Sequence, residues 1–464
     1  MNIFSTQSIE FDKNYKGLIL PVLIFLLVFF FSWWSNPSLE GRIYPDTYDF
    51  IHLAEDLSHP SNSLRPFLYP ILIRGAMKIS PDNWSKLIVL MQMLFHVTSI
   101  LLIYRMLLKY SNSVILSFIF SLAIGINPNL LYFTSAIVPT QLFGCFLVIN
   151  LFLFLSFWNN YKKTNNVWNK YFFIFGLFSA FTVTLRSMYF FGIIPFVISM
   201  IILKMRENIF FPIVILILLH LSVNTVWNQY KIGLKQEYQY GEKGFHPIKN
   251  TLLKTGGSWA NMAAIRGGMV DYGKGTKLYK ILEDKNLLNL ARKCKNGDYT
   301  EEFHTIYKEL TFQEKCDQEF SAQILKSHPF KIILIQLSNW HEFFNKRMFT
   351  PNPEKSFPIM HNYIRYLYVG SYNHLYRPFM PILLLMFIIL MVTKRIFNPL
   401  SLTGCLLVLF FSLGIALFSF HPGLFIYYRT AIEYILFICV FFPVIYIRSF
   451  LYKKMYLTTK MQNN

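Results

Sequence analysis

Long apolar runs recur along most of this chain, and they limit its fold more than any other feature does. A run of about 18 to 25 apolar residues is long enough to cross a bilayer as an α-helix. Hydrophobic residues make up 54% of the 464 residues and charged residues only 15%, which leaves too little polar surface for one soluble core. We expect about ten transmembrane helices, near residues 17–34, 86–107, 113–127, 137–157, 170–185, 188–204, 209–226, 378–393, 399–419 and 424–447.

The lysines and arginines between these runs indicate an orientation. Cytoplasmic loops carry an excess of Lys and Arg, and with the N-terminus inside every inner segment is basic. The first run lacks a small-residue cleavage site and ends at Trp33 and Trp34, so we expect a retained helix and not a signal peptide. This predicts a multi-pass protein of the plasma (inner) membrane with both termini cytoplasmic. The basic residues of the inner segments are Lys13, Lys16, Arg105, Lys109, Lys162, Lys163, Lys204, Arg206, Lys394, Arg395, Arg448, Lys453, Lys454 and Lys460.

The predicted topology divides the chain into three parts. Residues 1–226 form an N-terminal transmembrane module with a first outer loop at 35–85, and residues 378–464 form C-terminal transmembrane helices with a basic cytoplasmic tail. Between them, 227–377 is mostly polar and extracytoplasmic, with glycine-rich turns and helix-like patterns near 278–293 and 300–327. The expected fold class is an all-α polytopic membrane protein with a mainly α extracytoplasmic region.

The net charge indicates which kinds of partner the chain binds. The net charge of +20 fits membrane lipids with anionic headgroups, and it also fits an anionic, phosphate-bearing substrate. The basic residues are scattered among the spans without a nucleic-acid-binding motif, so no nucleic-acid partner is expected.

Cys294 and Cys316 both lie in the outer region, where an oxidising compartment predicts a disulfide. The remaining cysteines fall inside spans, where packing is expected, and they are Cys145, Cys405 and Cys439.

An acidic block follows the first run. Its apolar positions Phe50, Leu53, Ala54 and Leu57 have the spacing of an amphipathic helix lying along the membrane. Asp46 stands at the start of that helix, with Asp49 three residues later. The carboxylate of Asp46 has two interpretations: a helix cap that accepts backbone N–H groups, or an acceptor for a substrate hydroxyl proton.

A set of motifs resembles the GT-C glycosyltransferases, which use polyprenyl-phosphate sugars and include protein O-mannosyltransferases and lipid A aminoarabinose transferases. The first motif comprises Asp46, Phe50 and Ala54, followed by Arg65-Pro66 and Tyr69-Pro70. Weaker matches are Arg186 after a short span, Ala322 and Ile324 before His328-Pro329, and Tyr428-Arg429 at the last span. The chain departs from the family in three places: Ser187 follows Arg186, Gln141 stands where a Glu is usual, and Thr47 replaces the second acidic residue. Because Thr47 replaces the second acidic residue, the sequence does not decide between a site with a divalent metal and a site without one.

The resemblance implies roles for particular residues. Asp46 would be the catalytic base, with Asp49 as its substitute, and Arg65 would hold the donor phosphate through two parallel hydrogen bonds. Tyr69, Arg186 and Arg429 would be further donor-binding residues, although an aromatic belt or snorkelling to the interface also explains them. For His328 we expect a helix-start position before Pro329.

The function implied is transfer of a sugar from a polyprenyl-phosphate donor to a glycan, lipid or protein acceptor on the outer face, by an inverting displacement. Two alternatives stay open. A flippase or transporter would line its path with polar residues inside the spans. A surface-glycan polymerase would instead depend on arginines of the outer region such as Arg266 and Arg292.

Arg65 gives a test that depends on the sequence alone. Arg65→Lys keeps the charge but loses the planar fork, so we expect clearly weaker donor binding, and a larger loss for Arg65→Ala. The measurement is the donor-concentration dependence of transfer at matched expression. Equal rates for the wild type and Arg65→Ala would move the phosphate contact to another residue.

Overall fold

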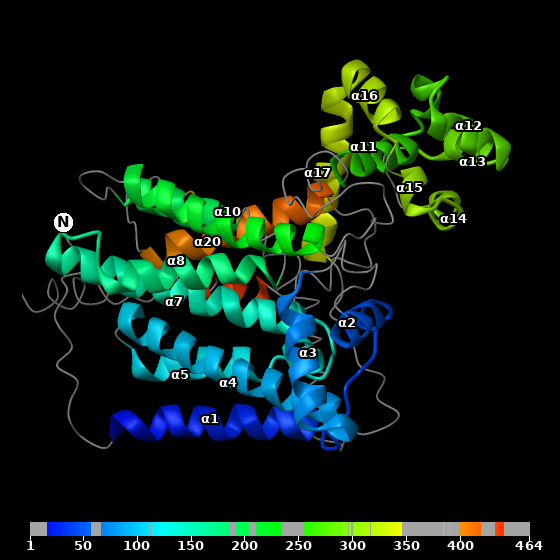
Figure 1. The fold of residues 1–464 in the computed structure, drawn as a ribbon. Coiled ribbons are helices and arrows are strands. Elements are labelled where there is room, and N and C mark those ends of the chain that lie inside the picture. The colour runs from blue at the N-terminus through cyan, green and yellow to red at the C-terminus, as the bar shows by residue number, and fades with distance from the viewer. Residues whose placement is uncertain are drawn as a thin grey trace, which may run out of the picture.

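The computed structural model describes residues 16–56, 66–111, 113–185, 192–203, 210–233, 255–295, 297, 300–315, 317–345, 384, 389, 399–418 and 432–439. In this part of the chain the structure is helical, without a named β-strand. An isolated parallel bridge joins Arg42 to Ala136. The helices form a bundle and a smaller helical region at one end of it (Figure 1).

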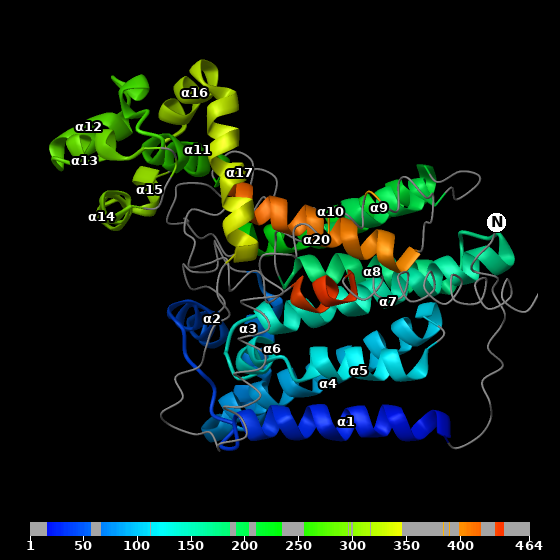
Figure 2. The same cartoon turned by 180° about the vertical axis from the view of Figure 1, so that it is seen from behind.

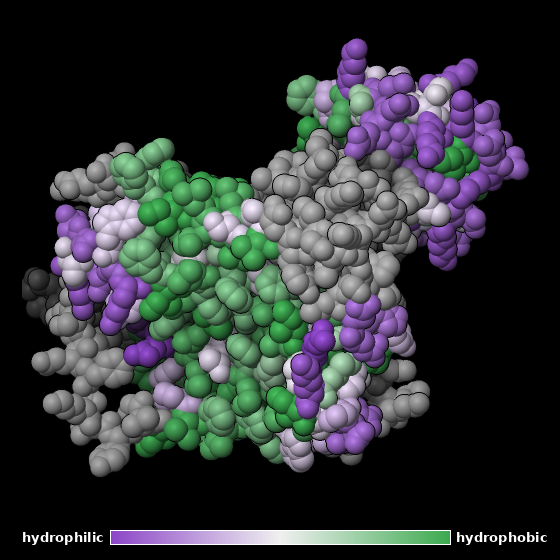
Figure 3. Space-filling view, in the orientation of Figure 1, coloured by the Kyte–Doolittle hydropathy of each residue, from purple (hydrophilic) through white to green (hydrophobic). Residues whose placement is uncertain are grey.

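The bundle helices run side by side and enclose one continuous apolar core (Figures 1 and 2). Their outward face is apolar as well (Figure 3). For example, Ile115 on α5 is 71% exposed and Phe210 on α10 is 70% exposed. A bundle that is apolar inside and outside suits a hydrocarbon solvent. Its helices are α1 (Lys16–Ser35), α4 (Trp84–Ser111), α5 (Val114–Gly125), α6 (Pro128–Thr134), α7 (Thr140–Thr164), α8 (Lys170–Val183), α9 (Ile193–Ile202), α10 (Phe210–Gly233) and α20 (Pro399–Phe418).

The expected ten spans are not confirmed. Two helices of the described part are long and apolar enough to cross a membrane: α7, and α4 taken together with the 3-10 turn η2 (Pro81–Asn83) that precedes it. Helices α5 and α6 pass the same criterion as a pair. The apolar stretches that the structure describes in the other bundle helices are 10–17 residues long, shorter than the roughly 20 residues that a full crossing requires. Most of the expected spans 378–393 and 424–447 lies outside the described residues.

The expected span at 113–127 is the first half of a bent pair. Helices α5 and α6 meet at an angle of 52°. Pro128 opens α6 and has no N–H to continue a helix, and the Asn127 side chain accepts a hydrogen bond from the N–H of Asn129 as the N-cap of α6. The sequence therefore restarts the helix at Asn127 instead of extending it.

Two short helices lie at the end of the bundle that carries the smaller helical region (Figures 1 and 2). They are α2 (Pro45–Glu55) and α3 (Leu68–Ile79). In α2, Phe50, Leu53 and Ala54 are buried while Tyr48 and His52 are exposed. The amphipathic helix expected from the acidic block is confirmed as far as Glu55, and Leu57 lies outside the described residues.

The smaller helical region has its own apolar core, separate from that of the bundle. Both helix patterns expected here are divided in the structure. The first breaks at Asn286, which takes the left-handed conformation (φ 56°), and the second breaks after Glu309 and again before the N-cap Asp317. The helices are α11 (Thr255–Arg266), α12 (Lys277–Asp284), α13 (Leu288–Lys293), α14 (Glu301–Glu309), α15 (Phe312–Lys315), α16 (Gln318–Ser327) and α17 (Pro329–Asn345).

The predicted disulfide is not formed. Cys294 is a free, buried thiol whose Sγ lies 3.5 Å from the carbonyl oxygen of Leu290. Cys316 lies outside the described residues. Burial raises the pKa of the Cys294 thiol, so this side chain is an inert part of the core.

Gly41 tests how tightly the segment before α2 packs. A Cβ added at Gly41 would lie 2.2 Å from Cδ1 of the buried Ile137 and 3.2 Å from Cβ of Ser85. We expect Gly41→Ala to lower stability by about 1–3 kcal/mol through overpacking. The matched control is Gly75→Ala in α3, where a Cβ meets nothing within 4 Å and should stabilise by about 0.5–1 kcal/mol. Thermal unfolding in detergent compares the two; an unchanged midpoint for Gly41→Ala would contradict the close contact.

Candidate functional site

Helix α2 carries the two candidate carboxylates and is anchored through the segment before it. The backbone N–H of Arg42 donates to the carbonyl of Ser135 (2.7 Å), and the N–H of Ile137 donates to the carbonyl of Arg42 (3.0 Å). These bonds join the start of α2 to the loop between α6 and α7. Residues about ninety positions apart in sequence thus form one surface at this end of the bundle.

Thr47 fixes the first turn of α2. Its hydroxyl donates to the carbonyl of Ile137 (2.8 Å) and accepts the backbone N–H of Tyr44 (2.9 Å), and its side chain is fully buried. The resemblance places an acidic residue here, whereas the structure places a neutral anchor. A buried carboxylate could not donate to the Ile137 carbonyl unless it were protonated.

Asp46 and Asp49 flank this anchor and are both half-buried. Their spacing of three residues places them on one face of α2. The residue at the N-cap position is Tyr44, and Asp46 lies in the first helical turn after Pro45. Asp46 is therefore not the cap itself, although an acidic residue in the first turn is favoured by the helix dipole.

A basic residue that the sequence reasoning missed lies beside α2. The guanidinium carbon of Arg42 is 4.2 Å from the centre of the Tyr132 ring, and the Tyr132 hydroxyl accepts a hydrogen bond from Tyr44 (2.6 Å). Within the described part of the chain Arg42 has no acidic partner. Its neighbours in sequence gave no signal, because Tyr132 is brought near only by the pairing of the two loops.

Tyr69 faces the core and not the surface. It is fully buried, and its hydroxyl donates to Oε1 of Gln92 (3.1 Å). Nε2 of Gln92 donates in turn to the carbonyls of Thr134 and Ala136, both at 2.9 Å. This hydrogen bond ties α3 and α4 to the loop that holds α2, and the contact of Tyr69 with a donor phosphate stays a prediction.

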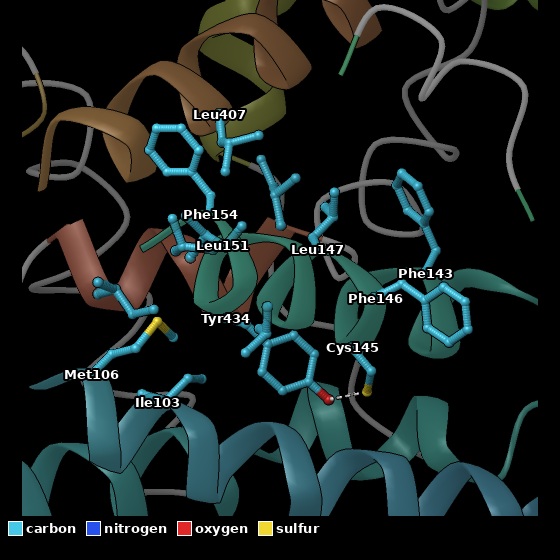
Figure 4. Packing of buried hydrophobic residues seen from close by; sticks show 14 of the residues in the cluster. Ile103, Met106, Phe143, Cys145, Phe146, Leu147, Leu151, Phe154, Leu407 and Tyr434 are labelled. Carbon is cyan, nitrogen blue, oxygen red and sulfur yellow. Dashed lines mark hydrogen bonds between the residues drawn. The ribbon is translucent and has the colours of Figure 1, made fainter. Parts of the chain in front are cut away.

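A second polar cluster lies deeper in the bundle, around Tyr434 (Figure 4). Nε2 of His96 lies 2.9 Å from the carbonyl of Gly125. That carbonyl only accepts, so Nε2 carries the proton in the neutral ring and Nδ1 accepts the Tyr434 hydroxyl (2.6 Å). The Tyr434 oxygen then accepts Nε2 of Gln141 and lies 3.5 Å from Sγ of Cys145. Gln141, which departs from the family pattern, belongs to a neutral network buried among apolar side chains.

Glu433 is a fully buried carboxylate next to this cluster. Its Oε2 lies 3.5 Å from the amide nitrogen of Asn127, at the break between α5 and α6. Polar residues thus occupy the interior of the bundle as well as its ends. The sequence analysis did not single out Glu433, which lies inside the expected span 424–447.

The other candidate residues fall into two groups. Arg65, Arg186 and Arg429 lie outside the described residues. His328 is the C-cap of α16, directly before Pro329 opens α17, and its ring lies 4.2 Å from that of Tyr272. It therefore joins two helices of the smaller region.

The two arginines of the polymerase alternative are engaged within the smaller helical region. Arg266 is almost fully buried, and its guanidinium donates to the carbonyl of Gly297 (3.1 Å) and to Oε1 of Gln336. Arg292 pairs with Asp271 through bonds of 2.6–3.1 Å. The hydrogen bonds from Arg292 lower the pKa of that carboxyl. Both arginines therefore hold the fold of this region.

The described residues do not fit a metal ion. Among them no group of three His, Cys, Asp or Glu side chains comes together in a way that could ligate one. At α2 the two carboxylates are separated by the neutral Thr47.

Comparison with known proteins gives no relative: no family model, curated protein or solved structure matches this chain.

Gln92 offers a test of the anchoring. Gln92→Leu keeps the volume but leaves the Thr134 carbonyl without its hydrogen bond in the core, at about 1–3 kcal/mol, while the Ala136 carbonyl keeps the bond from the N–H of Val138 (2.8 Å). We expect a clear loss of thermal stability, measured in detergent or nanodiscs. Tyr69→Phe removes one neutral bond to the same amide and should cost only about 1 kcal/mol. Equal, small losses for both variants would show that the loop is held by other contacts.

Proposed function

We propose that this chain is an integral membrane glycosyltransferase of the GT-C type. It moves a sugar from a polyprenyl-phosphate donor to a surface glycan, lipid or protein acceptor, on the side of the membrane that carries α2 and the smaller helical region. The proposal includes a plasma-membrane location with both termini cytoplasmic. The observation that carries it is α2: two half-buried carboxylates on one face of a short helix, anchored across the end of an apolar bundle.

The chemistry follows from this arrangement. The Asp46 carboxylate takes the proton of the acceptor hydroxyl as its oxygen attacks the anomeric carbon from the face opposite the phosphate. The bond from that carbon to the phosphate oxygen breaks, and polyprenyl phosphate leaves with the electron pair. One displacement inverts the anomeric configuration.

Negative charge grows on the leaving phosphate during this step, so a cation beside it lowers the barrier. Arg42 is suited to this role because it lies next to α2 and its guanidinium is already oriented by the Tyr132 ring. Arg65 is the second candidate. The fixed backbone pairing at Arg42 means that neither the carboxylates nor this cation must be positioned again in each turnover.

A second function, translocation of a lipid-linked glycan without bond formation, is favoured by one observation. Buried polar side chains occupy the bundle interior, including Glu433 and the cluster around His96. Polar groups inside spans often mark a substrate path. The groups of the cluster around His96, however, hydrogen-bond mainly to one another, which suits a structural role better than a path.

The test is Asp46→Asn in nanodiscs supplied with a panel of radiolabelled undecaprenyl-phosphate and decaprenyl-phosphate sugars. The amide keeps the shape but takes no proton, so we expect release of polyprenyl phosphate to fall by about 10²–10⁴-fold with unchanged thermal stability. The matched control is Asp82→Asn, an exposed acid in η2, which should act like the wild type.

Other outcomes separate the alternatives. Loss with Asp49→Asn alone would move the base to Asp49. Sugar-lipid movement across the bilayer without release of polyprenyl phosphate, unaffected by Asp46→Asn, would replace the transferase by a transporter.

A further inference from the structure

Helix α17 has two apolar faces, and only one of them is covered. Ile332 and Ile335 pack in the core of the smaller helical region, and Gln336 between α17 and α11 bonds to Arg266 and to the carbonyl of Trp259 (3.4 Å). At about 100° per residue these positions form one face. This face holds α17 in a fixed rotation relative to the rest of the region.

The opposite face is apolar and open. Phe330 is 79% exposed and Leu334 is 66% exposed, and Ile333 and Leu337 are exposed beside them. The four positions repeat at three- and four-residue intervals and fall within an arc of about 100°. A continuous stripe of four large apolar residues is far more than the scattered single exposures of a water-soluble surface.

The direction of α17 identifies what covers this stripe. Figure 2 shows α17 crossing the ends of the bundle helices instead of running along them, and it packs against α20 of the bundle. A helix that crosses the ends of the spans lies in the plane of a membrane surface. A membrane at this surface also covers the apolar outer face of the bundle in Figure 3.

The charges beside the stripe fit the same surroundings. Lys331 lies at the edge of the stripe and Lys326 lies one turn before α17, and both are exposed. An interfacial helix has large apolar residues towards the acyl chains and lysines at headgroup level, where they attract anionic lipid.

We propose that α17 is an interfacial helix and that Phe330, Ile333, Leu334 and Leu337 insert into the lipid leaflet on the side of the smaller helical region. The occupant of the stripe is the bilayer itself, at the boundary of headgroups and acyl chains. The covered face of α17 carries the smaller region, so this insertion sets the height of that region above the membrane. The proposal does not depend on the enzymatic activity.

The experiment uses the full chain in nanodiscs of phosphatidylcholine and phosphatidylglycerol. Phe330→Cys and Leu334→Cys are each labelled with a thiol-reactive NBD fluorophore, and the unsubstituted protein labelled in parallel gives the background of the native cysteines. Glu283→Cys, at an exposed position of α12, is the matched control. We expect blue-shifted emission at 330 and 334, with quenching by doxyl-labelled lipid several-fold stronger than at 283, and protection from aqueous iodide.

Two results would overturn the proposal. Emission and iodide quenching at 330 and 334 equal to those at 283 would place the stripe in water. Blue-shifted emission without quenching by doxyl-labelled lipid would show that protein covers the stripe, either another part of this chain or a second copy. Two labelled positions on one stripe keep the test valid if one variant does not fold.

Discussion

One neutral side chain, Gln92, holds together the end of the bundle on which the candidate site rests. Its amide nitrogen binds two backbone carbonyls of the loop after α6, and its amide oxygen binds the Tyr69 hydroxyl. Three elements meet on this group without any charge being buried. A charged residue in the same place would carry a desolvation cost of several kcal/mol in an apolar core, whereas an amide offers donors and an acceptor together. The loop then holds Arg42 and Thr47, and through them α2.

The cores of the bundle and of the smaller region both bury polar side chains. In the bundle most buried polar side chains are neutral, and His96, Gln141 and Tyr434 hydrogen-bond to one another, with Glu433 as a buried carboxylate beside them. The smaller region instead buries a guanidinium, Arg266, against backbone and amide oxygens. An ionised group is tolerated there because several hydrogen bonds replace its hydration.

The sequence predicted those helices that the pattern of neighbouring residues determines. The long apolar runs located α1, α4 and α20 to within a few residues, and the spacing of Phe50, Leu53 and Ala54 predicted the buried face of α2. What failed depends on partners distant in sequence or on one backbone residue. In the sequence Thr47 occupies the place of an acidic residue, and only the structure shows that its hydroxyl donates to the carbonyl of Ile137. Likewise, the residues around Arg42 in sequence do not predict its contact with the Tyr132 ring. The left-handed conformation of Asn286 divides a pattern that predicts a single helix.

The position of Tyr434 has a consequence for how the protein is made. Its hydroxyl lies between His96 and Gln141, which precede it by 338 and 293 residues. At about 5–20 residues per second, roughly 15 to 70 s of synthesis separate the emergence of these polar groups from that of their partner. During that interval the N-terminal helices hold unsatisfied donors and acceptors inside the membrane. The network closes only once residue 434 has been made, so the final packing of His96 and Gln141 depends on a helix synthesised about three hundred residues later.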